Sequence, residues 1–396
     1  MFEKICIKSK EFNSRKIDIA FLVETMLFYG KVQILVHKQE ITTLLQFFGE
    51  DLLAELINAG RVELHVRENI LGVMDFPEGK FGVQLFSNPK ETFSSILYQA
   101  HRVSVNNSTK NLAFSDKFSK ITTPFKYEND VVGQIKNDFC NSDFLNKTFP
   151  LYINSIVPEY KIPDELNVEI NNEKQMNKPF GDIDAFSMST NLDLKGINTL
   201  IKKINPTQEI NLSGYFLSLA ESKGDIYIAS TFESELVTSE LYSKFIAIQL
   251  DEIVRKRFSS QQNINLFEEC VLENCHKIGE AFVNGIIIKK DLLTILANAD
   301  KFRGWLSTVE EDKNIINEYR KAVVKESKLD KLPGKTVRFA IFQGIGLGVD
   351  LLGASGLGTV AMAGINVLDS FFLDKILKGW KPNQFIDNKL IPLIKK

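Results

Sequence analysis

Charged residues are almost absent from thirty consecutive positions near the C-terminus, and this stretch constrains the chain more than any other. Residues 339–349 carry no charge, Asp350 interrupts the run, and residues 351–368 add eighteen more uncharged positions. So much apolar surface has to be removed from water, because soluble proteins rarely leave a large contiguous apolar patch exposed. The stretch must therefore lie either in the protein's own interior or in lipid.

Small residues within this stretch predict two helices that pack closely. Several recur four positions apart, which places them in a row on one helical face and lets two backbones approach. A glycine-rich cluster at 353–358 supplies the turn, so we expect a helical hairpin with arms over about 337–352 and 359–378. The residues on which this hairpin depends are Gly344, Gly348, Asp350, Gly353, Gly356, Gly358, Ala363 and Gly364.

The length and the flanks of the hairpin favour a membrane. At 1.5 Å per residue the arms measure roughly 24 and 30 Å, which approaches the ~30 Å hydrocarbon core of a bilayer. Basic residues stand at both ends, as the positive-inside rule requires of a hairpin with both feet in the cytoplasm. They are Lys331, Lys335 and Arg338 before the first arm, and Lys375, Lys378 and Lys381 around the end of the second.

The same stretch also fits a soluble interior. Eighteen uncharged residues are the lower limit for a span, and glycine adds almost nothing to the free energy of transfer into lipid. Asp350, near the tip of the hairpin, would cost about 2.5–3.5 kcal/mol at the middle of a bilayer. A hairpin that is buried as core of the protein therefore stays open as the alternative.

The rest of the composition is that of an ordinary globular protein. Hydrophobic residues make up 44% of the chain and charged residues 25%, which excludes a disordered or collagen-like chain. The formal net charge of -2 creates no overall field toward nucleic acid, so we infer no nucleic-acid partner. Four scattered cysteines and an N-terminus without an apolar signal segment favour the cytoplasm.

The first hundred residues alternate between predicted strands and helices, which is typical of an α/β layer domain. Gly49 is expected to break the second helix, and Pro77–Lys80 to turn the last two strands into a hairpin. Strict alternation over 61–67 predicts one buried face and one open face, with His65 on the open one. The expected strands are 1–9, 31–37, 61–67, 70–76 and 81–87, and the expected helices are 17–29, 40–59 and 91–101.

The whole chain is expected to be α+β, with a small N-terminal α/β layer domain over 1–101 and a mostly α-helical C-terminal half. Residues 102–232 show few clean periods and are interpreted as a loop-rich mixed α/β connector or subdomain. A helical domain is expected over 233–330, and the Gly-rich hairpin and tail over 331–396. The helices expected in the third domain are 236–258, 266–282, 290–306 and 310–325.

Three residues are candidates for catalysis. Asp182 and Asp184 stand at i and i+2, so on a strand both carboxylates would face one side and could hold Mg²⁺ for phosphoryl transfer. The residues before them lack the Gly-Ser turn that nucleotidyltransferases carry, which favours a solvated loop instead. His37 ends a predicted strand, where α/β domains often place functional groups, but it has no partner nearby in the sequence.

Other motifs carry no chemistry, so we expect no cofactor and no metal. Gly356–Ala361 fits a dinucleotide-binding pattern but lacks the clean strand that must precede it. Cys270 and Cys275 have no second pair of ligands, as a zinc site would need. The layout of the first hundred residues resembles the core of phospholipase-D-type nucleases, which implies a His-x-Lys pair. None of the four histidines has a lysine two residues on, so the resemblance implies no activity.

These patterns favour a non-enzymatic cytosolic protein whose C-terminal hairpin inserts conditionally into a membrane and forms a homo-oligomer there. An effector or pore-like role, for example in bacterial defence, would fit such a protein. The alternative is a soluble ligand-binding or scaffold protein in which the hairpin is buried core. A Mg²⁺-dependent phosphoryl-transfer or nuclease-like enzyme is the third hypothesis.

Overall fold

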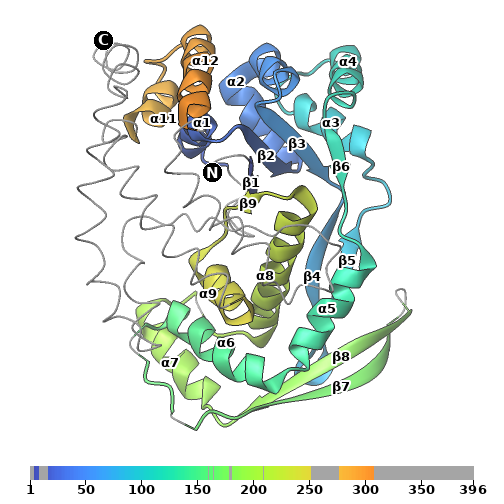
Figure 1. The fold of residues 1–396 in the computed structure, drawn as a ribbon. Helices are drawn as coiled ribbons and strands as arrows, with labels where there is room; N and C mark the ends of the chain where they lie inside the picture. The colour runs from blue at the N-terminus through green and yellow to red at the C-terminus, as the bar shows by residue number, and fades with distance from the viewer. Residues whose placement is uncertain are drawn as a thin grey trace, which may run out of the picture.

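The computed structural model of this chain describes residues 4–8, 17–158, 160–163, 165–177, 181–207, 209–250 and 276–306. Two sheets of different kinds organise these residues, one wholly parallel and one antiparallel (Figure 1). The expected α+β class, with an N-terminal sheet-and-helix region and helices later, is confirmed. The hairpin expected at 337–378 lies outside the described residues.

The parallel sheet is built from short apolar segments, most of them in the first third of the chain. Helices α1 (Ile19–Phe28) and α2 (Lys38–Asn58) connect its first three strands, as parallel neighbours require. Gly49 interrupts α2 with a φ of 75°, so the predicted break is confirmed. In spatial order the strands are β6 (Thr123–Phe125), β3 (Val62–Arg67), β2 (Lys31–Val36), β1 (Lys4–Lys8) and β9 (Glu235–Leu236).

The two faces of this sheet belong to two different hydrophobic cores. Ile5 and Ile7 of β1 enter the first core, together with α1, α2, α3 (Phe93–Arg102) and α4 (Ser108–Phe118). Cys6, between them, enters the second core with α8 (Leu212–Phe232) on the opposite face. Successive residues of a strand point to opposite faces, so one short strand contributes to both cores.

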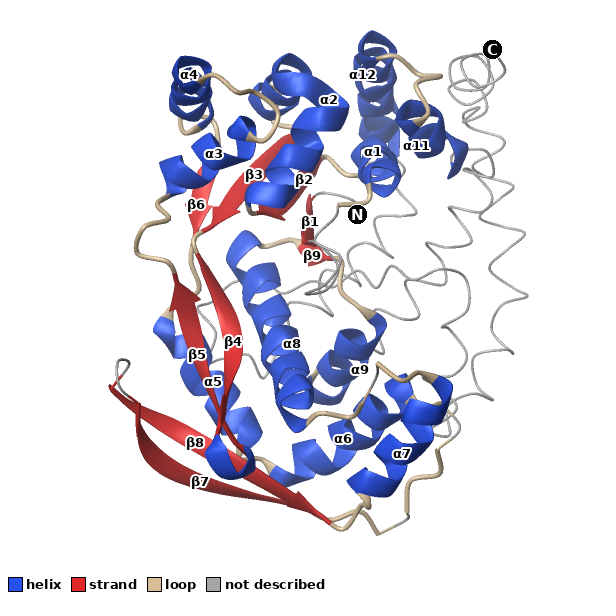
Figure 2. Cartoon of the chain, turned by 180° about the vertical axis from the view of Figure 1, so that it is seen from behind, coloured by secondary structure: helices blue, strands red, loops and turns tan. Residues whose placement is uncertain are grey.

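The antiparallel sheet continues from the end of the parallel one. Strand β4 (Asn69–Phe76) follows β3 and pairs with β5 (Lys80–Ser87) across the short helical turn at Pro77–Gly79, so the predicted hairpin is confirmed. Strands β8 (Gly181–Thr190) and β7 (Val168–Asn177) complete the sheet. Figure 2 shows helices α8 and α9 (Glu240–Gln249) in the space between the two sheets.

Helix α8 is the centre of the second core. Helices α5 (Asn129–Phe139), α6 (Ser142–Ile156) and α7 (Leu194–Ile204) also contribute to this core. The Phe216 ring stacks on Phe81 of β5 with 3.9 Å between ring centroids. Gly224 lets α8 approach β4, because a Cβ there would lie 2.8 Å from Leu71 Cδ1. This close approach holds α8 against β4, the strand that follows β3 of the parallel sheet.

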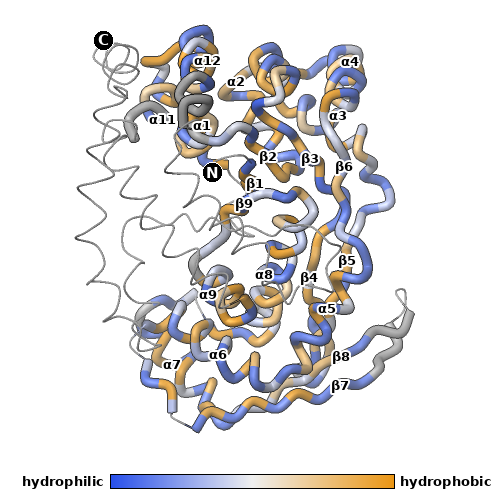
Figure 3. The backbone as a smooth tube through the Cα atoms, viewed as in Figure 1, coloured by the Kyte–Doolittle hydropathy of each residue, from blue (hydrophilic) through white to orange (hydrophobic). Residues whose placement is uncertain are grey.

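Residues 102–232 contain more helix and strand than the loop-rich mixed α/β connector or subdomain that the sequence led us to expect. They contain helices α4 to α8 and strands β6 to β8. Strand β8 pairs with β7, whose residues are predominantly hydrophilic (Figure 3). Strands β6 and β9 join the sheet of the N-terminal region across the boundaries expected at 101 and 232. The division into four domains stays a prediction.

The helices after residue 233 match the expectation in part. Leu236 lies in strand β9 rather than at the start of a helix, because it pairs with β1, and α9 begins at Glu240. Helix α12 (Lys289–Leu306) confirms the helix expected at 290–306, and α11 (His276–Val283) overlaps the one at 266–282. The helix expected at 310–325 lies outside the described residues. Within the described ranges, no helix combines the length and apolar character needed to cross a bilayer.

Candidate functional site

The parallel sheet has a point where its connections diverge. From β1 the chain reaches β2 through α1 on one face, whereas β9, on the other side of β1, is preceded by α8 on the opposite face. In open α/β sheets, ligands bind outside the carboxyl ends of the strands at such a switch point. Lys8 is the last residue of β1, and Thr238 follows β9 by two positions. Both residues therefore lie at this point.

A buried group of charges occupies the switch point. The Lys8 ammonium forms ion pairs with Asp225 and, at 3.0 Å, with Glu221. The Thr238 hydroxyl donates a hydrogen bond to Asp225, and the Tyr242 ring lies 5.5 Å from Lys8 Nζ. The Lys8, Glu221 and Asp225 side chains are 12%, 18% and 0% exposed. We call Lys8, Glu221, Asp225 and Thr238 the switch-point cluster.

Local structure explains why these residues meet. Lys8 is two positions after Cys6, so both face α8. Glu221 and Asp225 are four residues apart on α8, which places both carboxylates on one side of the helix. Taking a charge out of water is costly unless it is paired, so the lysine at the strand end and the two carboxylates depend on each other.

The protonation of the cluster follows from its burial and its charges. Burial opposes the charge of Lys8, but Asp225 and Glu221 outweigh it and raise the pKa of Lys8 well above its usual value. Burial raises the pKa of Asp225 to about 6, and Lys8 limits the rise. Burial likewise raises the pKa of the Cys6 thiol. At neutral pH Lys8 is a cation, Asp225 is an anion and Cys6 is a thiol.

This protonation limits what the cluster can do chemically. A protonated lysine and a neutral thiol are poor nucleophiles, so covalent catalysis by Lys8 or Cys6 is not favoured. Two carboxylates against one ammonium give the cluster a negative balance, which favours a ligand with a cationic group. In the described part of the chain, no three His, Cys, Asp or Glu side chains gather as a metal site would require.

His37 lies at the carboxyl end of β2, as the sequence predicted, and there it is the N-cap residue of α2. Its backbone N–H donates to the Glu40 carboxylate at 2.9 Å, and its Nε2 lies 3.5 Å from Glu91. Glu91 also forms an ion pair with Lys38. Burial, followed by the charge of Arg67, lowers the pKa of His37. His37 thus has acidic partners that sequence reasoning missed, and its backbone caps a helix.

Asp182 and Asp184 lie on strand β8, so the interpretation of this segment as a solvated loop is wrong. The strand forms because residues 181–190 pair with β7 over their whole length. The Asp184 carboxylate accepts a hydrogen bond from Lys136 of α5 at 2.6 Å. The structure does not join these aspartates to His37, which lies at the end of a strand in the other sheet. The residues 344–364 on which the predicted hairpin depends lie outside the described residues.

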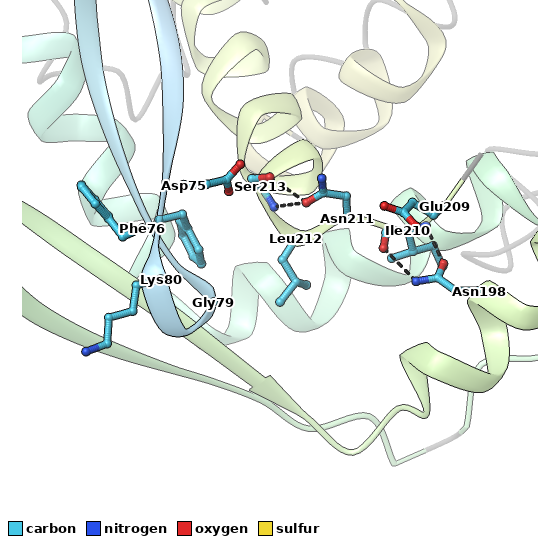
Figure 4. A pocket seen from close by; sticks show the side chains of 11 residues that line it. Asp75, Phe76, Gly79, Lys80, Asn198, Glu209, Ile210, Asn211, Leu212 and Ser213 are labelled. Atoms are coloured by element: carbon cyan, nitrogen blue, oxygen red, sulfur yellow. Dashed lines mark hydrogen bonds between the residues drawn. The ribbon is translucent and has the colours of Figure 1, made fainter. Parts of the chain in front are cut away.

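A pocket of about 470 Å³ lies between the β4–β5 turn and the start of α8 (Figure 4). Asn211 Oδ1 accepts hydrogen bonds from the backbone and hydroxyl of Ser213 at 2.9 and 2.6 Å. The Asn198 side chain donates a hydrogen bond to the Ile210 carbonyl and accepts one from the Ile210 N–H. These amides serve to hold the backbone at the start of α8, so the switch-point cluster is the stronger candidate site.

Comparisons of this chain with known protein families, with curated proteins and with solved structures find no match. The candidate site therefore depends on its geometry alone. Sequence reasoning missed its residues, although two signals were present. Lys8 is a lysine at the end of an apolar strand, and Asp225 is a single carboxylate before the apolar run 226–229.

Proposed function

We propose that this chain is a cytosolic protein whose C-terminal hairpin, at 337–378, inserts conditionally into a membrane and forms a homo-oligomer there. The observation that carries the proposal is the eighteen-residue uncharged run at 351–368 with its rows of small residues. The basic residues around the hairpin would hold both of its feet on the cytoplasmic side. Asp350 would reach the headgroups of the far leaflet.

The oligomer follows from the small residues. Gly344 and Gly348 stand four apart on the first arm, and Thr359 and Ala363 stand four apart on the second. Such rows let helix backbones approach within a membrane, where close packing rather than the hydrophobic effect joins helices. We expect small residues of the two arms to pack against each other within one copy. Small residues on neighbouring copies would then join the copies into an effector or pore-like assembly.

A charge placed within the uncharged run tests the proposal in the full chain. Val360→Glu should move the protein from the membrane fraction of expressing cells to the supernatant, because a buried carboxylate opposes insertion. Leu112→Glu is the matched control, since Leu112 is 56% exposed on the described body, and it should change nothing. Gly348→Leu should abolish dye leakage from vesicles, whereas Gly133→Leu, at an open position on α5, should not.

The soluble-core alternative makes the opposite prediction for the same variant. If the hairpin is core, Val360→Glu buries a charge in the protein and should lower its Tm in the absence of membranes. Under our proposal the Tm of the body stays unchanged. Wild-type protein that remains in the supernatant, together with a lowered Tm for Val360→Glu, would refute membrane insertion.

The switch-point cluster favours a second candidate function, which is binding of a small amine-bearing ligand by the body. The observation in its support is the negative balance of the cluster at the position where open α/β sheets bind ligands. Spermidine and arginine should raise the Tm of the full chain, and Glu221→Gln should reduce the rise. A rise with AMP alone, or with none of these compounds, would contradict this function.

A further inference from the structure

The end of α11 and the turn that leads to α12 expose three large aliphatic side chains. Val283, Ile286 and Ile288 are 38%, 52% and 57% exposed, and they lie within six consecutive residues. Single exposed aliphatic residues are normal on a protein surface, whereas three within so short a segment are a candidate for an interaction site. Figure 1 shows α11 and α12 at the end of the molecule opposite to the antiparallel sheet.

The turn has a defined structure that holds these side chains outward. Gly285 takes a φ of 74°, the left-handed conformation that commonly ends a helix, and its N–H donates to the Phe282 carbonyl at 3.0 Å. The Ile286 N–H donates to the Ala281 carbonyl at 2.8 Å. Ile287, between the exposed isoleucines, is 2% exposed and anchors the turn in the first core. The exposure therefore results from the fold of the turn.

Two exposed lysines, Lys289 and Lys290, directly follow the aliphatic group. They begin α12, where a basic residue opposes the helix dipole and lowers helix stability. The stability of α12 therefore does not explain the pair. The Lys289 ammonium lies beside the break in α2, 2.7 Å from where a Cβ of Gly49 would stand, whereas Lys290 is exposed. Along the chain, the nearest acidic residues are Asp291, which is half-buried, and Glu280, nine positions before Lys289. A bilayer surface with anionic lipids presents negative headgroups above apolar acyl chains. Exposed aliphatic side chains that are followed by exposed lysines match these two kinds of group.

We infer that Val283, Ile286, Ile288, Lys289 and Lys290 form a docking surface for an anionic bilayer. The aliphatic side chains enter the boundary of the acyl chains, and the ammonium groups bind phosphate or carboxylate headgroups. A protein partner is less well matched, because the group has no Trp, Tyr or Arg of the kind that anchors such interfaces. The inference deepens the proposed function and rests on it for the membrane partner, but it concerns contact before insertion.

Vesicle co-sedimentation of the full chain tests this surface. The vesicles contain equal parts of phosphatidylcholine and phosphatidylserine, and Ile286→Ser/Ile288→Ser should weaken binding about tenfold or more, since it removes apolar area that enters the lipid. Lys289→Gln/Lys290→Gln should weaken it about tenfold on these vesicles. The matched control is Leu112→Ser/Leu200→Ser, at sites 56% and 48% exposed elsewhere on the body, and it should bind as the wild type does.

The hairpin variant separates this inference from the proposed function. Val360→Glu keeps the docking surface, so it should still bind anionic vesicles but be released by alkaline carbonate, which strips proteins that have not inserted. Isoleucine and lysine variants that bind as tightly as the control overturn the docking surface and leave hairpin insertion standing. Wild-type protein that binds the vesicles yet is fully released by carbonate, as Val360→Glu is, supports the docking surface and contradicts insertion. Wild-type protein that binds neither anionic nor neutral vesicles overturns both.

Discussion

Replacing Lys8 with methionine removes the one cation of the switch-point cluster and keeps most of its volume. Asp225, with a fully buried side chain, then loses its ion pair, and Glu221 at 18% exposure loses a bond of 3.0 Å. Removing one partner of a buried ion pair typically costs about 3–5 kcal/mol, because the other charge stays buried without compensation. Domains are stable by only about 5–15 kcal/mol, so the loss should be a large part of the total.

The protonation of Asp225 limits this loss. Burial already raises the pKa of Asp225 to about 6 while Lys8 opposes the rise. Without Lys8 the pKa rises further, so at neutral pH the carboxyl takes up a proton instead of remaining a buried anion. We therefore expect Lys8→Met to fall near the lower end of the range, at about 3 kcal/mol. Lys8→Met/Asp225→Leu should regain most of that stability, because an apolar pair of similar volume often replaces a buried ion pair without loss.

Urea unfolding followed by far-UV circular dichroism measures these changes as shifts of the midpoint at constant slope. Lys31→Met is the matched control, because the Lys31 and Glu63 side chains are 33% and 37% exposed. An exposed pair contributes about 0–1 kcal/mol, so the control should unfold close to the wild type. A loss under about 1 kcal/mol for Lys8→Met, or a double variant no more stable than the single one, would refute the reasoning.

Two further predictions concern His65 and Gly279. Burial lowers the pKa of His65 from 6.5 to about 4, so the stability it contributes is full above pH 6.5 and falls by about 3 kcal/mol as the pH drops toward 4. His65→Phe should reduce this acid sensitivity in urea unfolding at several pH values, and an unchanged pH dependence would contradict the assignment. Gly279→Ala should cost about 1–3 kcal/mol, because its Cβ would overlap the backbone of Ala20 on α1. Gly133→Ala, with open space around the added Cβ, should instead gain up to about 1 kcal/mol, and equal effects of both changes would argue against the close approach.

The parts of the fold that could be predicted are those in which local sequence and burial agree. Val62, Leu64 and Val66 alternate with polar residues in the sequence, and all three are 0–1% exposed in β3. Gly49 was expected to break the second helix, and it has a positive φ in the structure. Such signals depend on neighbours in the sequence, so they need no knowledge of the rest of the chain.

Other elements could not be predicted because distant residues determine them. Helix α8 is buried around much of its circumference, including Ser222, Gly224 and Asp225, so its sequence shows no single apolar stripe. Strand β9 has two residues and is defined by its pairing with β1. His65 was expected on the open face of β3, yet it is 8% exposed because Phe232 stacks on its ring at 4.0 Å.

The candidate site shows the same limit. The position of His37 at a strand end followed from the pattern of β2, but its partner Glu91 comes from the segment before α3. Lys8 and Glu221 are separated by 213 positions and meet because α8 packs against the face of β1 that carries Cys6. The spacing of residues within a short motif cannot predict a contact between residues so far apart, so the cluster can be identified only in the folded chain.

The arrangement of the two cores also bears on how the urea experiments are interpreted. β1 contributes Ile5 and Ile7 to the first core and Cys6 to the second, so neither core can lose this strand without exposing the other. Lys8, at the end of β1, forms an ion pair with Asp225 of α8, next to the second core. Gly279 of α11 lies against the backbone of Ala20 on α1, next to the first core. Cores that share a strand should unfold in one cooperative transition. Lys8→Met and Gly279→Ala should therefore shift the same midpoint, and two separate transitions would show that β1 does not couple the cores.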